Sequence, residues 1–344
     1  MSLLPTETIS GWRPDVVDAI RAMRPGIIRF GGTSVREYYE WEEGIGDVDQ
    51  RVPFAELATG GLQPNNVGLD ELIALFRAVD AEPLICVRFT GKTPADAARQ
   101  VEYCNGAADT PYGSRRAANG HRQPYGVKYW QVGNEVYGNE YEAKLPEFCK
   151  AMKAVDPSIK ILASHPTSGV LESAGQYIDY VSPHWYFAED IQRIDTELQD
   201  VHRMIERHAP GRKIKLAVTE WNGANPNWGV GRAWLWTLDN ALKCARFHNY
   251  MHRHCDLIEI AIRSNMSNSF CGGGLQTNNS SLLKTPVFHA QALYANHQGV
   301  YPLRMDPPAG VGEKGLDLSA TLSADKKWLA LFVVNDQEQG VHQN

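Results

Sequence analysis

The stretch YWQVGNE, from Tyr129 to Glu135, has the pattern of a buried β-strand that ends in an amide and a carboxylate. Its apolar and aromatic residues favour a strand within a sheet. A second predicted strand, KIKLAVTEW (213–221), ends in the same way at Glu220. A rigid strand that holds a carboxyl group at the mouth of a pocket is a good support for catalysis. The segments around these two strands indicate whether their ends meet.

Strand and helix patterns alternate on both sides of these two segments. Helical periodicity recurs between the strands, first over residues 15–23 and last over residues 285–297. The expected apolar strands are GIIRF (26–30), PLICVRF (83–89), VKYWQVGNE (127–135), IKILAS (159–164), YVSPHWY (180–186), KIKLAVTEW (213–221) and LIEIAIRSN (257–265). Strands that alternate with helices in this way predict a parallel sheet.

A (β/α)₈ TIM barrel is the predicted fold, although the strands are one fewer than a closed barrel needs. The alternative is an open doubly wound sheet, which usually carries a glycine-rich nucleotide-binding turn, and the sequence contains neither GxGxxG nor GxxxxGK[ST]. Polar residues follow most of the predicted strands, at the edge where barrel enzymes build their sites. These residues are Arg29, Arg88, Asn134, Glu135, Ser164, His165, His184, Tyr186, Glu220, Trp221, Ser264 and Asn265. The barrel is expected over residues 1–300, and the strand pattern of residues 301–344 predicts the start of a β-sandwich domain.

The composition is that of a globular chain with a large core. Of its 344 residues, 43% are hydrophobic, and the net charge is −6 without runs of Lys or Arg. This charge argues against nucleic acid or an anionic membrane as a partner. The chain has no apolar stretch of about 18 residues that could span a membrane, and its start does not resemble a signal peptide. The six scattered cysteines predict reduced thiols in a cytoplasmic protein.

Glu135 and Glu220 are the strongest candidates for catalytic residues. For either glutamate alone, a salt bridge to a loop arginine explains its position as well as a catalytic role does. Two of them, on strands three βα units apart, can face each other across a barrel mouth, and such a pair suits glycoside hydrolysis. A separation of roughly 5–5.5 Å between the carboxyl groups would indicate retention of configuration, and roughly 6.5–9.5 Å would indicate inversion.

Other strand ends offer groups that could support this pair. A phenol at Tyr186, beside His184, could hydrogen-bond a carboxylate, although a packed aromatic pair is the alternative. Arg29 could anchor the same carboxylate or form an ion pair inside the barrel. Gln276, in the loop CGGGLQTNN expected after the last strand, could contact a substrate.

No metal site is predicted. His248 and His252 have helical spacing, and His254 follows them, but no HExxH motif is present. These three histidines are interpreted as the solvated end of an outer helix, where positive charge complements the helix dipole. Cys86, on an apolar strand, is interpreted as a core thiol.

Five segments, taken in order, resemble glycoside hydrolase family 51: RFGGTSVREYYEWEEGIGD, EPLICVRFTGKTPADAARQVEYCNG, ANGHRQPYGVKYWQVGNE, SPHWY and AVTEWN. The family contains α-L-arabinofuranosidases and some endo-β-1,4-glucanases, and the resemblance covers most of residues 11–300. It implies a (β/α)₈ barrel followed by a β-sandwich, retention of configuration and no metal or organic cofactor. It also implies an oligosaccharide or polysaccharide substrate and allows a homo-oligomer.

The resemblance assigns roles to individual residues. It implies that Glu135 is the general acid/base, that Glu220 is the nucleophile and that Asn134 binds the hydroxyl next to the anomeric carbon. The other residues expected to bind substrate are Arg29, Ser34, His184, Tyr186, Trp221 and Gln276. Ser34 takes the place of an Asn or Cys that follows R-[YFW]-P-G-G in the family. The family also has an earlier barrel strand with a substrate-binding Glu, so the chain is expected to be a fragment or a truncated reading frame.

The expected function is that of an exo-acting α-L-arabinofuranosidase that removes arabinose side chains from arabinoxylan or arabinan. An endo-β-1,4-glucanase or xylanase of the same fold is the first alternative, since the sequence does not separate a closed pocket from an open cleft. A carbohydrate-binding remnant without activity is the alternative from another class. A structural protein would leave the polar residues at most strand ends unexplained.

Overall fold

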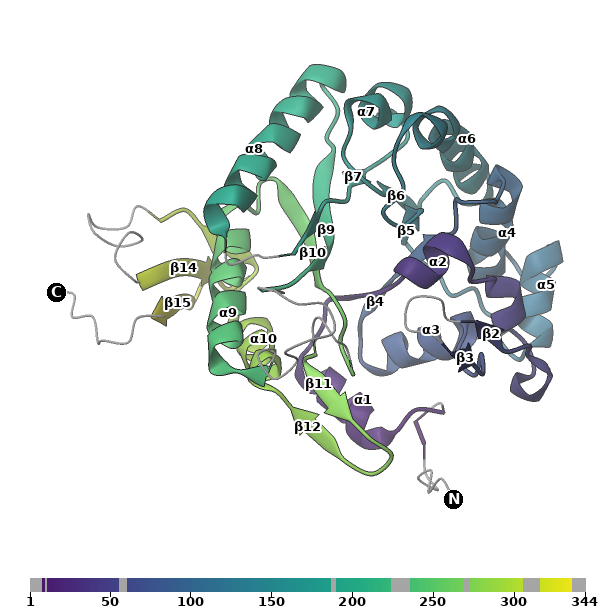
Figure 1. Ribbon diagram of the computed structural model, residues 1–344, viewed down its shortest axis with the longest axis horizontal. Helices are drawn as coiled ribbons and strands as arrows, with labels where there is room; N and C mark the ends of the chain where they lie inside the picture. Colours follow the sequence, from purple (N-terminus) through teal and green to yellow (C-terminus); the bar gives the residue numbers. More distant parts are fainter. Residues whose placement is uncertain are drawn as a thin grey trace.

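A curled parallel sheet forms the centre of the molecule, and helices cover its outside (Figure 1). The computed structural model describes residues 8–9, 11–55, 61–186, 190–223, 236–268, 273–305 and 316–335. The eight strands follow the order β1-β4-β5-β6-β7-β9-β10, with β8 paired to β9. Their bounds are Ile27–Phe30 (β1), Glu82–Val87 (β4), Tyr129–Val132 (β5), Lys160–Ala163 (β6), Tyr180–Val181 (β7), His184–Trp185 (β8), Lys215–Trp221 (β9) and Ile258–Arg263 (β10).

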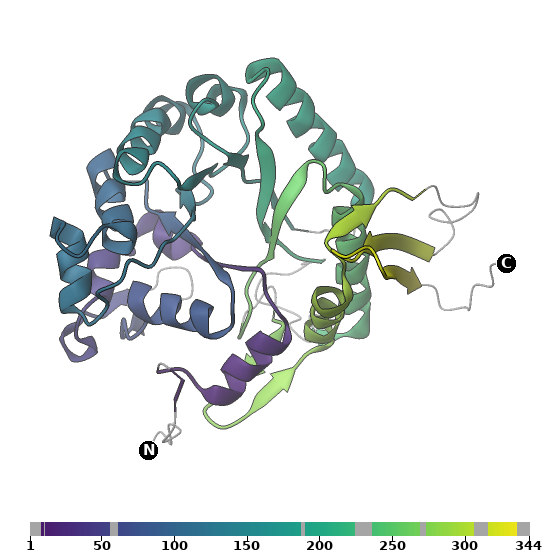
Figure 2. The same ribbon diagram turned by 180° about the vertical axis from the view of Figure 1, so that it is seen from behind.

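The predicted partial barrel is confirmed. All neighbouring strands of this sheet are parallel, and each predicted strand contributes to it. The segment 180–186 is divided into β7 and β8 at Ser182 and Pro183, because proline has no N–H to donate to a neighbouring strand. Strands β1 and β10 are the two edges of the curled sheet (Figures 1 and 2). Residues of both strands line a cavity of about 760 Å³.

Helices alternate with these strands. The helices are Pro14–Ala22 (α1), Thr33–Glu37 (α2), Leu69–Ala78 (α3), Pro94–Asn105 (α4), Pro111–Ala118 (α5), Asn139–Val155 (α6), Ser168–Ala174 (α7), Ile191–His208 (α8), Leu238–Arg253 (α9) and Pro286–His297 (α10). A side chain caps the first turn of α4, α5, α7, α8 and α9. In α8, every third or fourth residue is buried: Ile194, Leu198, Val201 and Ile205. Helix α4 begins with a capping box, in which Thr93 and Asp96 bond reciprocally to each other's backbone N–H groups.

The core lies between the sheet and its helices. Strands such as β4, β5 and β9 are buried almost throughout, as expected for parallel strands covered on both faces. Trp130, Trp185 and Trp221 are among the largest fully buried side chains. This packing gives the strand ends a rigid support.

Two further segments contain short helices and strands outside the main sheet. Residues 31–54 include α2, two short 3₁₀ helices (Trp41–Gly44 and Val48–Gln50) and the beginning of β2 (Phe54–Ala55), which pairs with β3 (Leu62–Gln63). The prediction of a loop around Gln276 is wrong, because β11 (Leu275–Thr277) pairs antiparallel with β12 (Leu282–Lys284). Cys271, in the same segment, lies outside the described residues.

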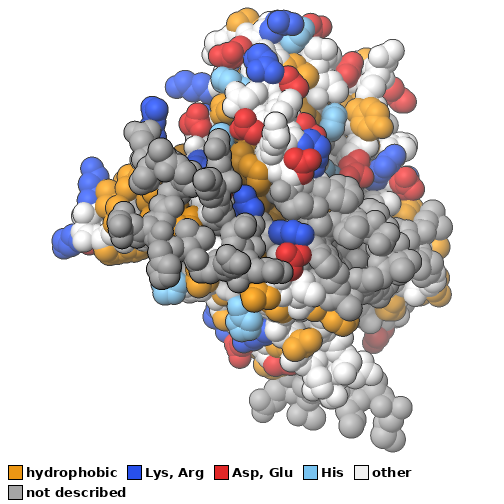
Figure 3. Space-filling view, turned by 60° about the vertical axis from the view of Figure 1, so that its left-hand side comes forward, with side chains coloured by type: hydrophobic (Ala, Val, Ile, Leu, Met, Phe, Trp, Pro, Cys, Tyr) orange, Lys and Arg blue, Asp and Glu red, His pale blue; other side chains and the backbone are white. Residues whose placement is uncertain are grey.

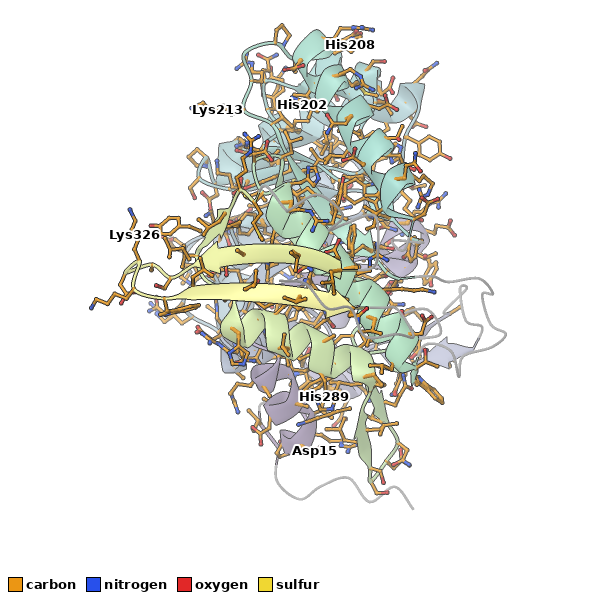
Figure 4. All side chains as sticks on the ribbon, turned by 90° about the vertical axis from the view of Figure 1, so that its left-hand side faces the viewer. Asp15, His202, His208, Lys213, His289 and Lys326 are labelled. Carbon is orange, nitrogen blue, oxygen red and sulfur yellow. The ribbon has the colours of Figure 1, made fainter. Side chains whose placement is uncertain are left out.

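A small antiparallel sheet stands where the start of a β-sandwich is expected. Its strands are Tyr301–Leu303 (β13), Leu316–Leu322 (β14) and Leu329–Asn335 (β15), and it lies across α9 and α10 (Figure 4). The outer face of β15 exposes Leu329, Leu331 and Val333, and Figure 3 shows hydrophobic side chains gathered on this projection. The domain boundary at residue 300 stays a prediction.

The interpretation of the α9 histidines as a solvated helix end is wrong. His248 stacks on Tyr294 with 4.7 Å between the ring centres, and burial lowers the pKa of His248 to about 3. His252 Nδ1 lies 2.9 Å from the hydroxyl of Ser319 in β14. The helix end is covered by α10 and the small sheet, so these rings serve packing.

Within the described ranges, no helix is long and apolar enough to cross a bilayer.

Candidate active site

The two glutamates meet at the carboxyl ends of the strands. Glu220 lies on β9, and Glu135 follows β5 across the barrel mouth. One carboxylate oxygen of each residue lies within 4.8 Å of the other and of a ring nitrogen of His184. The two strand ends that looked alike in sequence therefore form one site.

Glu220 is the deeper of the two carboxylates, with 12% of its side chain exposed. Arg29 Nη1 donates to Glu220 Oε1 over 2.9 Å, and the Tyr186 hydroxyl donates to Oε2. Burial would raise the pKa of Glu220, but the charges of Arg29 and His184 and the hydrogen bond from Tyr186 outweigh it. The pKa of Glu220 is therefore held below the ordinary value of a glutamate, and this residue is ionised at neutral pH.

Glu135 lies nearer the surface, with 41% of its side chain exposed. Its backbone has a φ of 51°, in the left-handed region that residues other than glycine rarely adopt, and Gly133, two residues earlier, has a φ of 75°. This turn at the end of β5 gives the carboxylate its direction toward His184. Backbone strain of this kind is concentrated at functional sites, where the surrounding structure holds it in place.

His184 connects the two glutamates. Its Nδ1 lies 2.9 Å from Glu135 Oε1 and 3.6 Å from Glu220 Oε2. Its Nε2 lies 3.1 Å from the hydroxyl of Thr219, which fixes the ring between the carboxylates. One ring therefore sets the separation of the pair.

Arg29 holds the floor of the site. Its guanidinium donates to Gln131 Oε1 over 3.0 Å and to Asn134 Oδ1, in addition to Glu220. A Cβ atom at Gly31 would collide with the sulfur of Cys86 and crowd this guanidinium, so only glycine fits there. Burial raises the pKa of the Cys86 thiol, in agreement with its interpretation as a core residue.

The geometry of Glu135, His184 and Glu220 is also compatible with a metal ion, since each offers one ligand atom to a common point. The Arg29 guanidinium, however, already supplies positive charge to Glu220 at hydrogen-bond distance. The arrangement needs no cation to neutralise the buried carboxylate, so a hydrogen-bonded acid pair explains it fully.

Three residues have expected substrate contacts that stay predictions, because no side-chain hydrogen bond or ion pair of the described residues joins them to this group. Trp221 is buried against Phe247 of α9, with 4.8 Å between the ring centres, because successive side chains of β9 point to opposite faces. Ser34 lies in the first turn of α2, where its carbonyl accepts from the Tyr39 N–H. Gln276 lies on the hairpin strand β11, opposite Leu283.

Other residues of the site were not predicted. Gln131 is a fully buried amide in an apolar strand, and this contrast was a usable signal. Thr219 directly precedes Glu220, in a strand where neighbouring residues were treated as packing. Arg36 of α2 lies with its Nη1 4.0 Å from Glu135 Oε2, a contact between segments far apart in sequence that no local pattern indicates.

The large cavity adjoins one side of this site. Glu220, Arg29 and Ser264 line it at the carboxyl ends of the strands, and it continues between β1 and β10 toward Glu82 and Glu259. The cavity therefore extends from the Glu220 carboxylate to the gap between the edge strands β1 and β10.

Comparison with known proteins agrees with this geometry. Residues 19–203 match the family model described as "Alpha-L-arabinofuranosidase 1 domain". A probable alpha-L-arabinofuranosidase C of Aspergillus clavatus is 28% identical over 394 residues, covering 97% of this chain and 77% of that protein. An intracellular exo-alpha-(1->5)-L-arabinofuranosidase 1 of Bacillus subtilis is 26% identical, covering 97% of this chain and 77% of that protein.

A solved structure leads to the same family. The thermostable GH51 alpha-L-arabinofuranosidase from Thermotoga petrophila superposes with a TM-score of 0.85 at 28% identity, covering 99% of this chain and 79% of that one. The family match spans more than half of the residues. The chain therefore belongs to the α-L-arabinofuranosidases of glycoside hydrolase family 51.

Proposed function

We propose that this protein is a retaining, exo-acting α-L-arabinofuranosidase that releases arabinose from arabinoxylan- or arabinan-type polysaccharides. One observation carries the proposal: Glu135 and Glu220 approach within 4.8 Å in two different environments. A retaining glycosidase holds its two carboxyl groups roughly 5–5.5 Å apart, which leaves no room for a water between nucleophile and sugar, and an approach of one oxygen from each group within 4.8 Å is compatible with this spacing. The names of the relatives, which are α-L-arabinofuranosidases, support arabinose as the released sugar.

Glu220 is the proposed nucleophile. Its ionised carboxylate attacks the anomeric carbon, a C–O bond forms to the enzyme, and the bond to the leaving-group oxygen breaks. Arg29 and Tyr186 keep the carboxylate charged and aimed. Asn134, with its oxygen held by Arg29, has its amide N–H groups to donate to a sugar hydroxyl.

Glu135 is the proposed acid and base. Its carboxyl group gives a proton to the leaving-group oxygen in the first step. In the second step its carboxylate takes a proton from water, the water oxygen bonds to the anomeric carbon, and the ester to Glu220 breaks. Its partial exposure allows water to reach it between the two steps.

The direct test is hydrolysis of 4-nitrophenyl α-L-arabinofuranoside and of carboxymethyl-cellulose by the purified chain. Release of 4-nitrophenol without action on the cellulose derivative is expected. Activity on the cellulose derivative alone would favour the endo-glucanase. Tight oligosaccharide binding with no turnover would favour the inactive remnant. A cytoplasmic location is part of the proposal, and the word "intracellular" in the name of the Bacillus subtilis relative supports it.

Tyr186→Phe is expected to move the acid side of the kcat/KM profile to higher pH. The substitution removes a hydroxyl that donates to Glu220, so the depressed pKa of this carboxyl group rises and its protonation begins at higher pH. Tyr180→Phe is the matched control, because the Tyr180 hydroxyl donates to Glu259 near the start of β10. A Tyr186→Phe profile that coincides with that of the wild type would contradict this role of Tyr186.

Treatment with EDTA is expected to leave kcat on the 4-nitrophenyl substrate unchanged. Arg29 already neutralises Glu220, so the proposed steps need no cation at Glu135, His184 and Glu220. The measurement compares untreated protein with protein dialysed against EDTA and then against buffer. Loss of activity that Zn²⁺ or Ca²⁺ restores would overturn the proposal of a metal-free site.

A further inference from the structure

Glu135 has exposed neighbours that the two hydrolytic steps do not use. From these we propose that Arg36, Tyr137 and His165 form the subsite for the leaving group and that they bind a neutral sugar residue there. This subsite rests on the proposed function, and it concerns the leaving group, which the two catalytic glutamates do not specify.

The position of the leaving group follows from the two carboxylates. Glu220 attacks from the buried end of the pocket, and Glu135 protonates the oxygen of the bond that breaks. The released part of the substrate must therefore lie beside Glu135, on its solvent side. Side chains around the exposed part of Glu135 are those that a leaving group meets first.

Arg36 bounds one side of this region. It projects from α2, and its Nη1 lies 4.0 Å from Glu135 Oε2 (Figure 1 shows α2 beside the strand ends). With 39% of its side chain exposed, the guanidinium is open to a ligand. Its planar set of N–H donors can bond two adjacent oxygens of a sugar.

Tyr137 and His165 lie on the loops that follow β5 and β6. Tyr137 follows Glu135 by two residues. It is 68% exposed, which is unusual for a large aromatic side chain. Its ring centre lies 5.6 Å from that of His165, which is also exposed and lies near enough to Glu135 and His184 for their charges to act on its pKa. An exposed aromatic face of this kind can pack against the C–H face of a sugar ring.

The loops that carry these rings are held in place. The Val136 N–H donates to the hydroxyl of Ser164 over 2.9 Å, which ties the loop after β5 to the end of β6. The Tyr141 hydroxyl donates to the Val132 carbonyl over 2.7 Å and accepts from the Ser164 N–H over 2.8 Å. Tyr137 and His165 are thus presented on a prearranged surface, which limits the entropy lost on binding.

The charges around Arg36 favour a neutral sugar. Its Nε lies 3.5 Å from Glu37 Oε1, and Glu135 lies on its other side. These two carboxylates balance the guanidinium, so the subsite offers hydrogen-bond donors without excess positive charge. A pentose residue of an arabinan or xylan chain fits this chemistry better than an acidic sugar does.

The test compares two substrates that differ only in the leaving group. One is an α-(1→5)-linked arabinose disaccharide, and the other is methyl α-L-arabinofuranoside, whose leaving group also needs a proton but carries no sugar. Arg36→Ala is expected to lower kcat/KM on the disaccharide roughly 10- to 100-fold, the range for lost hydrogen bonds to a charged group. On the methyl glycoside the loss should stay within about threefold. Tyr137→Ala should cost roughly 3- to 10-fold on the disaccharide alone.

The controls separate the possible failures. Arg203→Ala removes an exposed arginine of α8 that pairs with Asp200, and it should change neither substrate. Equal losses on both substrates would show that Arg36 acts through Glu135 and would overturn the subsite, as would no loss on the disaccharide. A wild-type chain that cleaves neither glycoside, nor the 4-nitrophenyl substrate, would instead refute the proposed function.

Discussion

Glu220→Ala is expected to lower kcat on 4-nitrophenyl α-L-arabinofuranoside roughly 10⁴- to 10⁶-fold, the usual cost of removing a nucleophile. Glu135 cannot take its place, because Glu135 lies on the leaving-group side. Azide should restore turnover by entering the space that the side chain vacates. Since azide then attacks once from the nucleophile's side, the product should be the β-azide, with inverted configuration.

Two further variants make this result specific. Glu220→Ala leaves the Arg29 guanidinium buried without its carboxylate, which could destabilise the fold. Glu220→Gln keeps the shape and should lose activity to a similar extent, with a melting temperature closer to that of the wild type. Glu206→Ala, on the exposed face of α8, should behave as the wild type. Activity of Glu220→Gln within tenfold of the wild type would exclude Glu220 as the nucleophile.

Glu135→Ala is expected to show a loss that depends on the leaving group. Hydrolysis of the α-(1→5)-linked disaccharide should fall roughly 10³- to 10⁵-fold, because its sugar oxygen leaves only when protonated. The bond to 4-nitrophenolate should still break, since this anion leaves without a proton, and the glycosyl-enzyme should then accumulate. Azide should release it as the α-azide, with retained configuration.

The pattern of losses identifies the acid/base. A burst of 4-nitrophenol followed by slow turnover is the expected time course for Glu135→Ala. Glu140→Ala, an exposed glutamate of α6 that pairs with Lys144, is the control on the same side of the barrel. Equal losses on the disaccharide and on the aryl substrate would contradict acid/base catalysis by Glu135.

The barrel and its central pair followed from local patterns. Apolar strands that alternate with amphipathic helices leave few architectures, and the carboxyl ends of parallel strands share one edge. Glu135, Glu220, Arg29, His184 and Tyr186 were found because each ends a predicted strand. The position of Trp221 could have been anticipated as well, since the alternation of β9 turns it to the face opposite Glu220.

The rest depends on contacts between distant segments. The left-handed backbone of Glu135 has no local signal, because glycine is the residue that usually indicates this conformation. Arg36 reaches Glu135 from α2, a short helix that is far from Glu135 in sequence. The histidines of α9 looked solvated because the helix that covers them, α10, and the small sheet come later in the chain.

The most direct test of the central claim is to identify the residue that carries the sugar in the glycosyl-enzyme. Glu135→Ala protein is mixed with 4-nitrophenyl α-L-arabinofuranoside, quenched in acid and digested, and its peptides are analysed by mass spectrometry. The structure predicts one pentose on the peptide that contains Glu220, and none when Glu220→Gln is added to the same protein. A pentose on another residue, or release of 4-nitrophenol with no adduct at any time, would contradict double displacement at Glu220.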